Sequence, residues 1–420
     1  MIERYCTPAM TAIWSRQAKY ERWMQVELAI CAAHAEDGTI PPQDFKQIKS
    51  KARFDLARCD EIEKETRHDL AAFVRNLEEN VGPAGRWIHL GVTSYDVIDS
   101  ALGTMLRDSC DVLLKSAKGL KKQIVRLEAK HKKTPMIGRT HGVHAEPITF
   151  GHKCASWRVE LDRNMERLEE AKRQVAVGKV SGAVGIHAHV NRKTEARICA
   201  SLGLSPDPVS TQIINRDRHA QFLNTLALLG AGLERMATEL RNLQRTEILE
   251  VQEAFKAGQK GSSSMPHKRN PWNSETVVGL ARVLRGNAHS MLESVCTWHE
   301  RDLTNSSLER VVLPDSCQLA DFMLLRMTAV LQGLVVLPKN MKANLRLMGD
   351  LVYSEHLLNA LIKSGMSRQD AYKVAQRNAE KAWKGDDFKE CVRRDPQVAK
   401  RLSKAELDKV FSLSHHLRNA

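Results

Sequence analysis

The sequence predicts an all-α protein built around a long central helical bundle, and three observations carry this prediction. Apolar residues recur at steps of three and four along three long segments. Alternating patterns typical of strands are few and short. The chain has 420 residues, too many for one compact core of ordinary size, so we expect two or three packed units.

Three apolar stripes define the long helices. They run from Leu113 to Leu127, from Cys154 to Leu168 and from Phe222 to Leu243. A stripe that averages 3.5 residues per step is typical of a bundle seam. No proline interrupts residues 209–265, so we expect a helix over about 40 of them, about 60 Å long. Helices of that length rarely bury their stripe in a small monomer, which favours a bundle shared between subunits.

Composition shifts divide the chain into three sections. Residues 1–110 carry shorter periodic pieces, interrupted by "GTIPP" and "NVGPAG". Residues 111–364 carry the long stripes, and a helical section covers 365–420. At the last boundary Gly365 should end one helix and Ser367 should cap the next.

Charge and composition narrow the function classes. The 64 Lys+Arg and 50 Asp+Glu give a net charge of +14, which favours anionic partners. Only 5% of residues are aromatic and no RNA-binding signature is present, so phosphate- or carboxylate-bearing metabolites are favoured over nucleic acid. A solvated charged surface is the plain alternative. No apolar run approaches the roughly 20 residues of a membrane span, and the first residues lack a signal-peptide core, so we expect a cytoplasmic protein.

Cysteines and histidines argue against metal chemistry in the sequence motifs. None of the nine cysteines falls in a CxxC pair, which disfavours a disulfide framework and a structural zinc site. Residues 138–147 read "GRTHGVHAEP" and place His141, His144 and Glu146 close together. This is not the H-E-x-x-H pattern of zinc-binding helices, so a proton-transfer histidine is favoured over a metal ligand.

Residues 261–271, "GSSSMPHKRNP", hold more hydrogen-bonding groups than a solvated turn needs. Further polar clusters occur in "ETRHDLAAF", "WIHLGVTSYDVIDSAL", "STQIINRDRH" and "WHERDLTNSSLER". Hydroxyls at helix starts are commonly plain caps, and single arginines are commonly solvated. Several such groups in a basic protein can instead hold a phosphate or carboxylate.

The motifs resemble those of a known family. "GSSSMPHKRNP" is similar to the signature loop of the fumarase/aspartase superfamily, and "GVTSYDVIDSAL" and "GRTHGVHAEP" resemble its two other shared regions in the expected order. With "RYCTPAM", "TRHDLAAF" and "HERDLTNSS", the likeness extends over the chain to the bacterial adenylosuccinate lyase family. It implies a homotetramer with a 20-helix core, active sites built from three subunits, and fumarate elimination from adenylosuccinate and SAICAR without metal or organic cofactor.

The resemblance also implies residue roles. Ser262 would be the general base, with its oxyanion stabilised by donors such as loop N–H groups, and His141 the general acid, oriented by Glu275. Lys268 would stabilise the carbanion, and His68 would act beside the substrate. Residues implied to bind substrate are Arg4, Tyr5, Arg67, His68, Asp69, His89, Thr93, Ser94, Gln212, Ser263, Lys268, Asn270, Arg301, Ser306 and Arg310.

The chain departs from the family pattern in a few places. Thr276 stands where many relatives carry Asn, Trp272 and Asn273 replace small or aliphatic residues, and the C-terminus is about ten residues shorter. The alternatives are another fumarate-releasing lyase, such as argininosuccinate lyase, a non-catalytic helical scaffold, and a basic RNA-binding protein. Retention of Ser262 and His141 disfavours the scaffold.

Overall fold

The computed structural model describes residues 1–255, 258 and 261–419. Within this part the chain is all-α, as predicted, with 18 α-helices and three two-stranded sheets. It folds into two compact units, each assembled from three separate segments. The first unit comprises Met1–Gly119, Leu161–Arg235 and Thr276–Met327; the second comprises Leu120–Glu160, Met236–Glu275 and Thr328–Ala420. The division into three sections at residues 110 and 364 stays a prediction.

Five long helices contribute residues to both units. They are α6 (Ser94–Lys130), α7 (Phe150–Val175), α9 (Asp217–Leu243), α10 (Trp272–Glu293) and α11 (Thr304–Gly333). In the first unit a Cβ on Gly230 of α9 would meet side chains of both α10 and α11, so the three helices pack closely there. In the second unit an ion pair joins Lys153 of α7 to Glu239 of α9 at 2.7 Å. None of the described helices is both long and apolar enough to cross a membrane.

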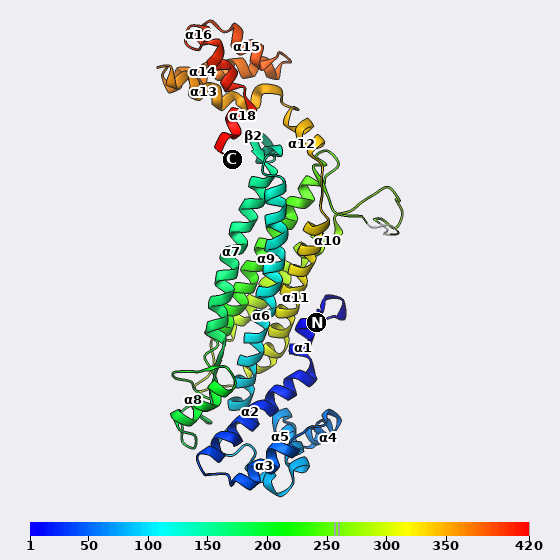
Figure 1. Cartoon of the computed structure of the whole chain (residues 1–420), viewed down its shortest axis with the longest axis vertical. Helices are drawn as coiled ribbons and strands as arrows, with labels where there is room; N and C mark the ends of the chain where they lie inside the picture. The colour runs from blue at the N-terminus through cyan, green and yellow to red at the C-terminus, as the bar shows by residue number, and fades with distance from the viewer. Residues whose placement is uncertain (256–257, 259–260, 420) are drawn as a thin grey trace. The chain divides into compact units, whose positions relative to one another are not determined.

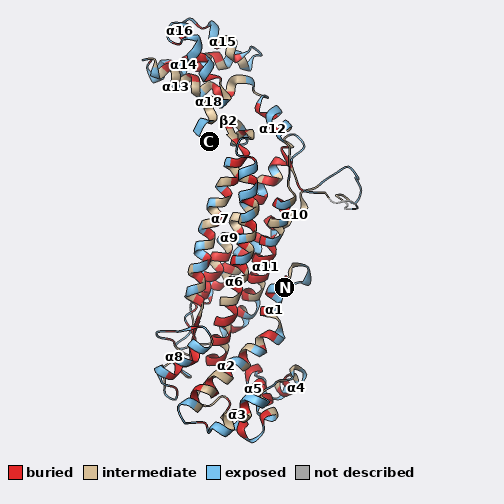
Figure 2. Ribbon diagram, in the orientation of Figure 1, coloured by how far each residue is buried: buried red, intermediate tan, exposed pale blue. Residues whose placement is uncertain are grey.

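The predicted seams are confirmed as the buried faces of these helices (Figure 2). From Leu113 to Leu127 the seam residues of α6 are at most 1% exposed, and from Phe222 to Leu243 those of α9 are at most 3% exposed. The seams are therefore covered within one chain. The inference that stripes of this length need a second subunit for their burial is wrong.

The helix expected over about 40 residues is shorter than predicted. Helix α9 has 27 residues and ends at Leu243, although the next proline is Pro266. Tertiary contacts stop it instead: the Gln244 side chain accepts the amide of Glu253 at 2.9 Å, and Leu249 adopts a positive φ of 41°. The carboxylate of Glu250 is then buried against Arg139. Arg139 lies 111 residues from Glu250, and the Gln244–Glu253 contact does not follow a helical spacing, so periodicity could not place the stop.

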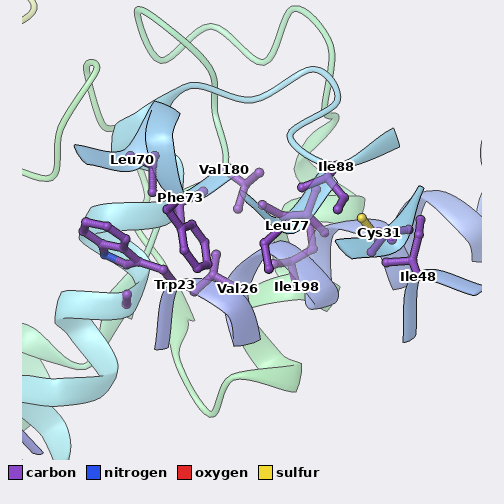
Figure 3. Packing of buried hydrophobic residues seen from close by; sticks show 14 of the residues in the cluster. Trp23, Val26, Cys31, Ile48, Leu70, Phe73, Leu77, Ile88, Val180 and Ile198 are labelled. Atoms are coloured by element: carbon purple, nitrogen blue, oxygen red, sulfur yellow. The ribbon is translucent and has the colours of Figure 1, made fainter. Parts of the chain in front are cut away.

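Several of the remaining elements of the first unit, together with the start of α6, form an apolar core around α2 and α5. Trp23, Val26 and Phe73 lie in this core and are at most 3% exposed (Figure 3). The remaining elements are η1 (Glu3–Tyr5), α1 (Pro8–Trp14), α2 (Arg16–Glu36), α3 (Pro42–Lys51), α4 (Leu56–Thr66), α5 (Asp69–Val81), η2 (Pro83–Trp87), β3 (Val177–Gly178), α8 (Arg192–Ser201) and β4 (Ser205–Pro206).

The second unit packs short C-terminal helices against a β-hairpin. Ile137 of the hairpin joins Leu357, Leu361 and Phe411 in one core. Ser367 caps α14, as predicted, by accepting the Asp370 amide. The elements are β1 (Pro135–Thr140), β2 (Val143–Thr149), β5 (Val251–Gln252), β6 (Val335–Val336), α12 (Pro338–Leu345), η3 (Gly349–Tyr353), α13 (Ser354–Lys363), α14 (Arg368–Trp383), α15 (Phe388–Arg394), α16 (Pro396–Ala399), α17 (Lys404–Val410), α18 (Leu413–His416) and η4 (Leu417–Asn419).

Candidate active site

Four predicted site residues from three segments meet at the start of α5. His68 caps this helix: its Nδ1 accepts the Ala71 amide at 3.3 Å. An imidazole nitrogen that accepts carries no proton, so in the neutral ring Nε2 is the protonated nitrogen. That Nε2 lies 3.4 Å from Ser94 Oγ. Beside it the Asp69 carboxylate pairs with Arg310 of α11 at 2.8 Å.

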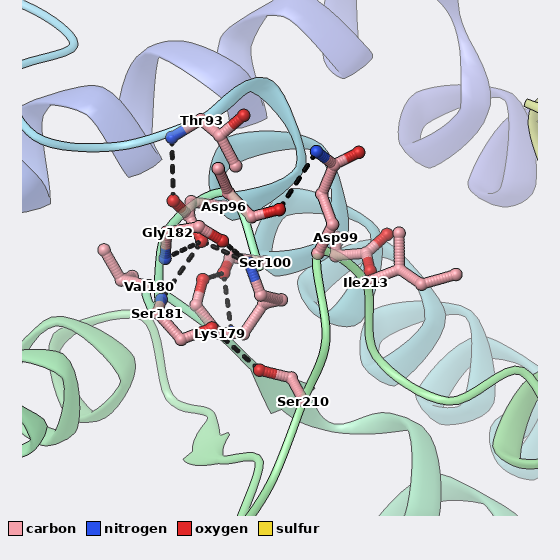
Figure 4. Close-up of polar contacts among 12 residues, drawn as sticks. Thr93, Asp96, Asp99, Ser100, Lys179, Val180, Ser181, Gly182, Ser210 and Ile213 are labelled. Carbon is pink, nitrogen blue, oxygen red and sulfur yellow. Dashed lines mark hydrogen bonds and ion pairs between the residues drawn. The ribbon is translucent and has the colours of Figure 1, made fainter. Parts of the chain in front are cut away.

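A buried ion pair shapes the backbone that carries Thr93 and Ser94 (Figure 4). Asp96, in the first turn of α6, accepts the Thr93 amide at 2.8 Å and the Ser181 amide at 3.1 Å. It is also paired with Lys179, and both side chains are fully buried. Neither Asp96 nor Lys179 stands out in the sequence, because a buried charged residue looks like a solvated one there.

His89 is held by a buried glutamate. Its amide donates to Glu27 Oε2 at 3.1 Å, and its Nδ1 lies 2.6 Å from Glu27 Oε1. Burial of the ring lowers the pKa of His89, but the Glu27 carboxylate more than offsets this, so the pKa is raised above its ordinary value. Glu27 is only 1% exposed. The pair fixes the orientation of a histidine that sequence analysis assigned to substrate binding.

Arg301 and Gln212 form a second polar group in the first unit. Arg301 donates to the Gln212 side chain at 3.1 Å, and its guanidinium carbon lies 3.7 Å from the ring centre of Tyr95. Tyr95 is in turn hydrogen-bonded to Ser306. A second terminal nitrogen of Arg301, Nη2, is buried without a hydrogen-bond partner within the described residues. An unsatisfied buried cationic donor is suited to an anionic ligand.

The predicted Ser306 and Arg310 line a cavity of about 290 Å³ together with Lys19 and Arg16. Lys19 is half-buried, and its partial burial lowers its pKa. Sequence analysis did not select either cation, since nothing in the pattern around them separates them from solvated residues. Arg4 and Tyr5 lie in η1, where the Tyr5 ring packs edge-on against Phe322 at 5.2 Å.

A buried charge network holds the segments that carry Gln212, Ser306 and Arg310. Arg216 donates to Glu309 at 2.7 and 3.0 Å and to Asp99 at 2.7 and 2.8 Å, and its side chain is fully buried. Burial alone would raise the pKa of Asp99, but the guanidinium holds it below its usual value. The network links α6, the start of α9 and α11, and sequence analysis missed all three members.

The signature loop, residues 261–271, belongs to the second unit and folds back on itself. The amides of residues 264 and 265 donate to Ser262 Oγ at 3.3 and 3.1 Å. Asn270 Nδ2 donates to the Gly261 carbonyl at 2.9 Å. A Cβ added at Gly261 would lie 2.0 Å from the Lys268 carbonyl oxygen, so this position admits only glycine. Ser262 is half-buried, whereas Ser263 and Lys268 are exposed.

Anchors on either side of the signature loop hold its ends. The Gln244 side chain donates to the Arg269 carbonyl at 3.0 Å. Glu253 accepts the Ser274 amide at 2.9 Å and the Asn273 side chain at 2.7 Å. The unusual Asn273 therefore ties the start of α10 to the segment that precedes the loop.

His141 occupies the two-residue turn between β1 and β2 and is exposed. Within the second unit Arg139 pairs with Glu250 at 2.8 Å, which fastens the hairpin to the chain that leads into the signature loop. Glu275 lies in the first turn of α10 and is exposed. No hydrogen bond or ion pair joins Glu275 to His141 in the described part of the chain, so the expected orienting contact is not formed here.

Backbone conformation marks three of the predicted site residues. Arg67, His89 and His141 have φ of 57°, 65° and 56°, a region that residues other than glycine rarely adopt. Only three other non-glycine residues in the described chain share it. Such conformations cluster at functional sites, where the surrounding structure enforces them. For His141 the conformation also suits the tight hairpin turn, which requires a positive φ at both central residues.

Two family models match the sequence. The first, described as lyase, matches residues 3–286, and the second, described as adenylosuccinate lyase C-terminus, matches residues 350–420.

Curated relatives match over essentially the full length. The adenylosuccinate lyase of a Synechocystis species is 51% identical, with 100% of this chain and 98% of that protein covered. The adenylosuccinate lyase of Bacillus subtilis is 46% identical, with coverages of 100% and 97%.

Solved structures share the fold. A fumarate lyase from Mesorhizobium sp. BNC1 superposes with a TM-score of 0.90 at 27% identity, covering 99% of this chain and 96% of that one. A 3-carboxy-cis,cis-muconate lactonizing enzyme from Pseudomonas putida gives a TM-score of 0.88 at 29% identity, with coverages of 98% and 94%.

Proposed function

Because this chain belongs to the adenylosuccinate lyase family, we propose that it cleaves adenylosuccinate into AMP and fumarate. We propose the same elimination for SAICAR, which gives AICAR and fumarate. In both reactions a carbon–nitrogen bond breaks and a carbon–carbon double bond forms. The chemistry is proton transfer and charge stabilisation, which side chains supply.

Ser262 removes the proton from the carbon beside a carboxylate. A serine hydroxyl is a weak base at neutral pH, and it can act only where its oxyanion is stabilised. The observation that carries this proposal is the pair of amides that donate to Ser262 Oγ at 3.3 and 3.1 Å. These donors are part of the backbone, so they need no reorganisation when charge develops on the oxygen.

Lys268 and Asn270 stabilise the charge that the lost proton leaves behind. The electron pair delocalises into the neighbouring carboxylate, where an ammonium and an amide donor lower the barrier. The electrons then form the double bond of fumarate, and the carbon–nitrogen bond breaks. His141 donates a proton to the departing nitrogen, so that the proton and electron counts balance. Glu275 and His68 assist as orienting and substrate-facing groups.

The substrate's anionic groups are held by the polar residues of the first unit. The buried, unpartnered Nη2 of Arg301 and the cavity lined by Lys19, Ser306 and Arg310 support binding of a phosphate or carboxylate there. Charge-assisted bonds of this kind are stronger than neutral ones and are geometrically specific. The substrates are small metabolites, without nucleic acid or membrane partners, and the enzyme acts in the cytoplasm.

The enzyme works as a homotetramer whose active sites combine residues of several subunits. Apolar side chains that remain exposed on the long helices of the first unit support this proposal. Leu228 of α9, Val283 of α10 and Val311 of α11 are 52%, 46% and 58% exposed. Large apolar side chains left in solvent on three packed helices are what a subunit interface would cover.

Purified protein mixed with adenylosuccinate tests the function, with ultraviolet absorbance following substrate loss and a fumarate assay following the product. We expect turnover in the wild type and in Ser264→Ala, which keeps the loop amides, and almost none in Ser262→Ala. Turnover by Ser262→Ala at the wild-type rate would refute the role of this serine. Fumarate from argininosuccinate but not from adenylosuccinate would preserve the mechanism and overturn the substrate.

A further inference from the structure

Two histidines and a glutamate converge on the hairpin in the second unit, outside the residues assigned to catalysis. They are Glu146 of β2, His356 of α13 and His416 of α18, and their donor atoms lie within 4.8 Å of one another. The two rings lie 4.5 Å apart between centres and are tilted by 47°, with His416 Nδ1 and His356 Nε2 in contact. Glu146 Oε1 lies 3.9 Å from His356 Nε2, and all three side chains are half-buried.

The protonation of His416 is fixed by a backbone carbonyl. Its Nε2 lies 2.8 Å from the Pro147 oxygen. A carbonyl can only accept, so Nε2 carries the proton, and in the neutral ring Nδ1 presents its lone pair toward His356 and Glu146. An imidazole whose outer N–H donates to a carbonyl while its inner nitrogen faces other donors has the usual arrangement of a metal-bound histidine.

A second carboxyl lies beside the cluster. The exposed Glu355 hydrogen-bonds to Glu146, so these two carboxyls share a proton, and His356 Nε2 donates its proton to His416 Nδ1. A divalent ion can take the place of these shared protons. A divalent ion would compensate the carboxylate charge and satisfy the imidazole nitrogens together.

We propose that Glu146, His356 and His416 bind a divalent transition-metal ion of the Zn²⁺ type. Imidazole with carboxylate favours Zn²⁺ over Mg²⁺ or Ca²⁺, which take oxygen ligands. Tetrahedral bonds of about 2.0–2.1 Å place neighbouring donors about 3.3 Å apart. The present separations reach that value through side-chain shifts of about 1.5 Å or less, and a water would complete the coordination.

The site would fasten the C-terminal helix to the hairpin. Glu146 and the Pro147 carbonyl belong to β2, whereas His416 lies almost at the end of the chain. The ion would thus join two segments about 270 residues apart and brace the strand pair whose turn carries His141. This role is structural and does not depend on the proposed reaction.

Metal-free full-length protein titrated with Zn²⁺ alone tests the proposal by calorimetry, with Co²⁺ absorbance as a second readout. We expect one tight site per chain in the wild type. His356→Gln and His416→Gln should each weaken it by at least about tenfold, because even an outer-shell partner is worth about that much. His415→Gln is the matched control: it alters the adjacent histidine, which lies outside the cluster, and should bind as the wild type does.

Thermal unfolding supplies an independent measurement. Zn²⁺ should raise the midpoint of the wild type and of His415→Gln but not that of the two ligand variants. Equal Zn²⁺ affinity in wild type and His416→Gln, or no binding by the wild type, would overturn the site. If His356→Gln or His416→Gln does not fold, Glu146→Gln supplies the test. Unchanged Zn²⁺ affinity in Glu146→Gln would equally refute the proposal.

Discussion

The buried network around Arg216 makes a quantitative prediction about stability. Arg216→Met removes the cation that pairs with both Asp99 and Glu309, whose side chains are 0% and 8% exposed, and leaves two buried carboxylates without this partner. Four charge-assisted hydrogen bonds of 2.7–3.0 Å are lost with it. Removing one partner of a buried ion pair costs about 3–5 kcal/mol, so we expect a loss of that size in the free energy of unfolding.

Urea titration at fixed protein concentration measures the effect. The matched control is Arg58→Met, which removes a similar two-pronged pair with Glu79 at 2.9 and 3.1 Å, but with side chains 44% and 37% exposed. Exposed pairs of this kind commonly contribute nothing measurable to stability. The change in the free energy of unfolding of Arg58→Met should therefore lie close to the error of the titration. Burial is thus the main difference between the two substitutions.

Lowering the pH provides an internal check on the stability loss expected for Arg216→Met. In Arg216→Met the carboxyl of Asp99 has lost its cation, and burial then favours its protonated form. The destabilisation should therefore shrink as the pH falls, and Asp99→Asn added to the variant should recover part of the loss. An Arg216→Met protein no less stable than Arg58→Met at neutral pH would refute the reasoning.

Three further predictions concern the loop, the pH dependence and the assembly. Gly261→Ala should lower kcat by about 100-fold without moving the unfolding midpoint, because its Cβ would lie 2.0 Å from the Lys268 carbonyl oxygen; steady-state assays showing unchanged kcat would contradict this. The pKa of His89 is raised, so the stability from its charge is complete below its ordinary value of 6.5 and is lost as the pH rises through the raised native value. The stability gap between wild type and Glu27→Gln, measured in urea, should narrow as the pH rises from 6.5 through the raised native pKa, and a constant gap would count against the pair. Leu228→Asp, at a side chain 52% exposed, should lower the particle mass in light scattering while leaving the helical signal intact, and an unchanged mass would remove this residue from the interface.

The long helices could be predicted because the apolar pattern that defines each helix lies within its own segment of sequence. Each seam repeats every three or four residues, so the faces of α6 and α9 were readable without knowing what covers them. The end of α9 could not be read in the same way. It depends on Gln244 and Glu250, whose partners Glu253 and Arg139 come together only in the folded unit.

The candidate site shows the same division. Ser262 and His141 stand in dense motifs that set them apart from ordinary loop residues. Glu27, Lys179 and Arg216 stand in plain helical or loop sequence, and their partners lie between 62 and 117 residues away. A sequence does not distinguish a buried charged residue from a solvated one, and only the tertiary structure shows which is which.

The interleaving of the two units bears on how the protein is made. The first unit needs residues up to Met327, although its first segment ends at Gly119. At about 5–20 residues per second, a ribosome takes about 10–40 s to synthesise what lies between these points. During most of that interval α6 has emerged without α11, whose Asp321 accepts a hydrogen bond from Ser116 of α6. The nascent chain therefore exposes the apolar face of α6 for much longer than a helix needs to form. Synthesis of the folded protein should depend on chaperones that bind exposed apolar segments.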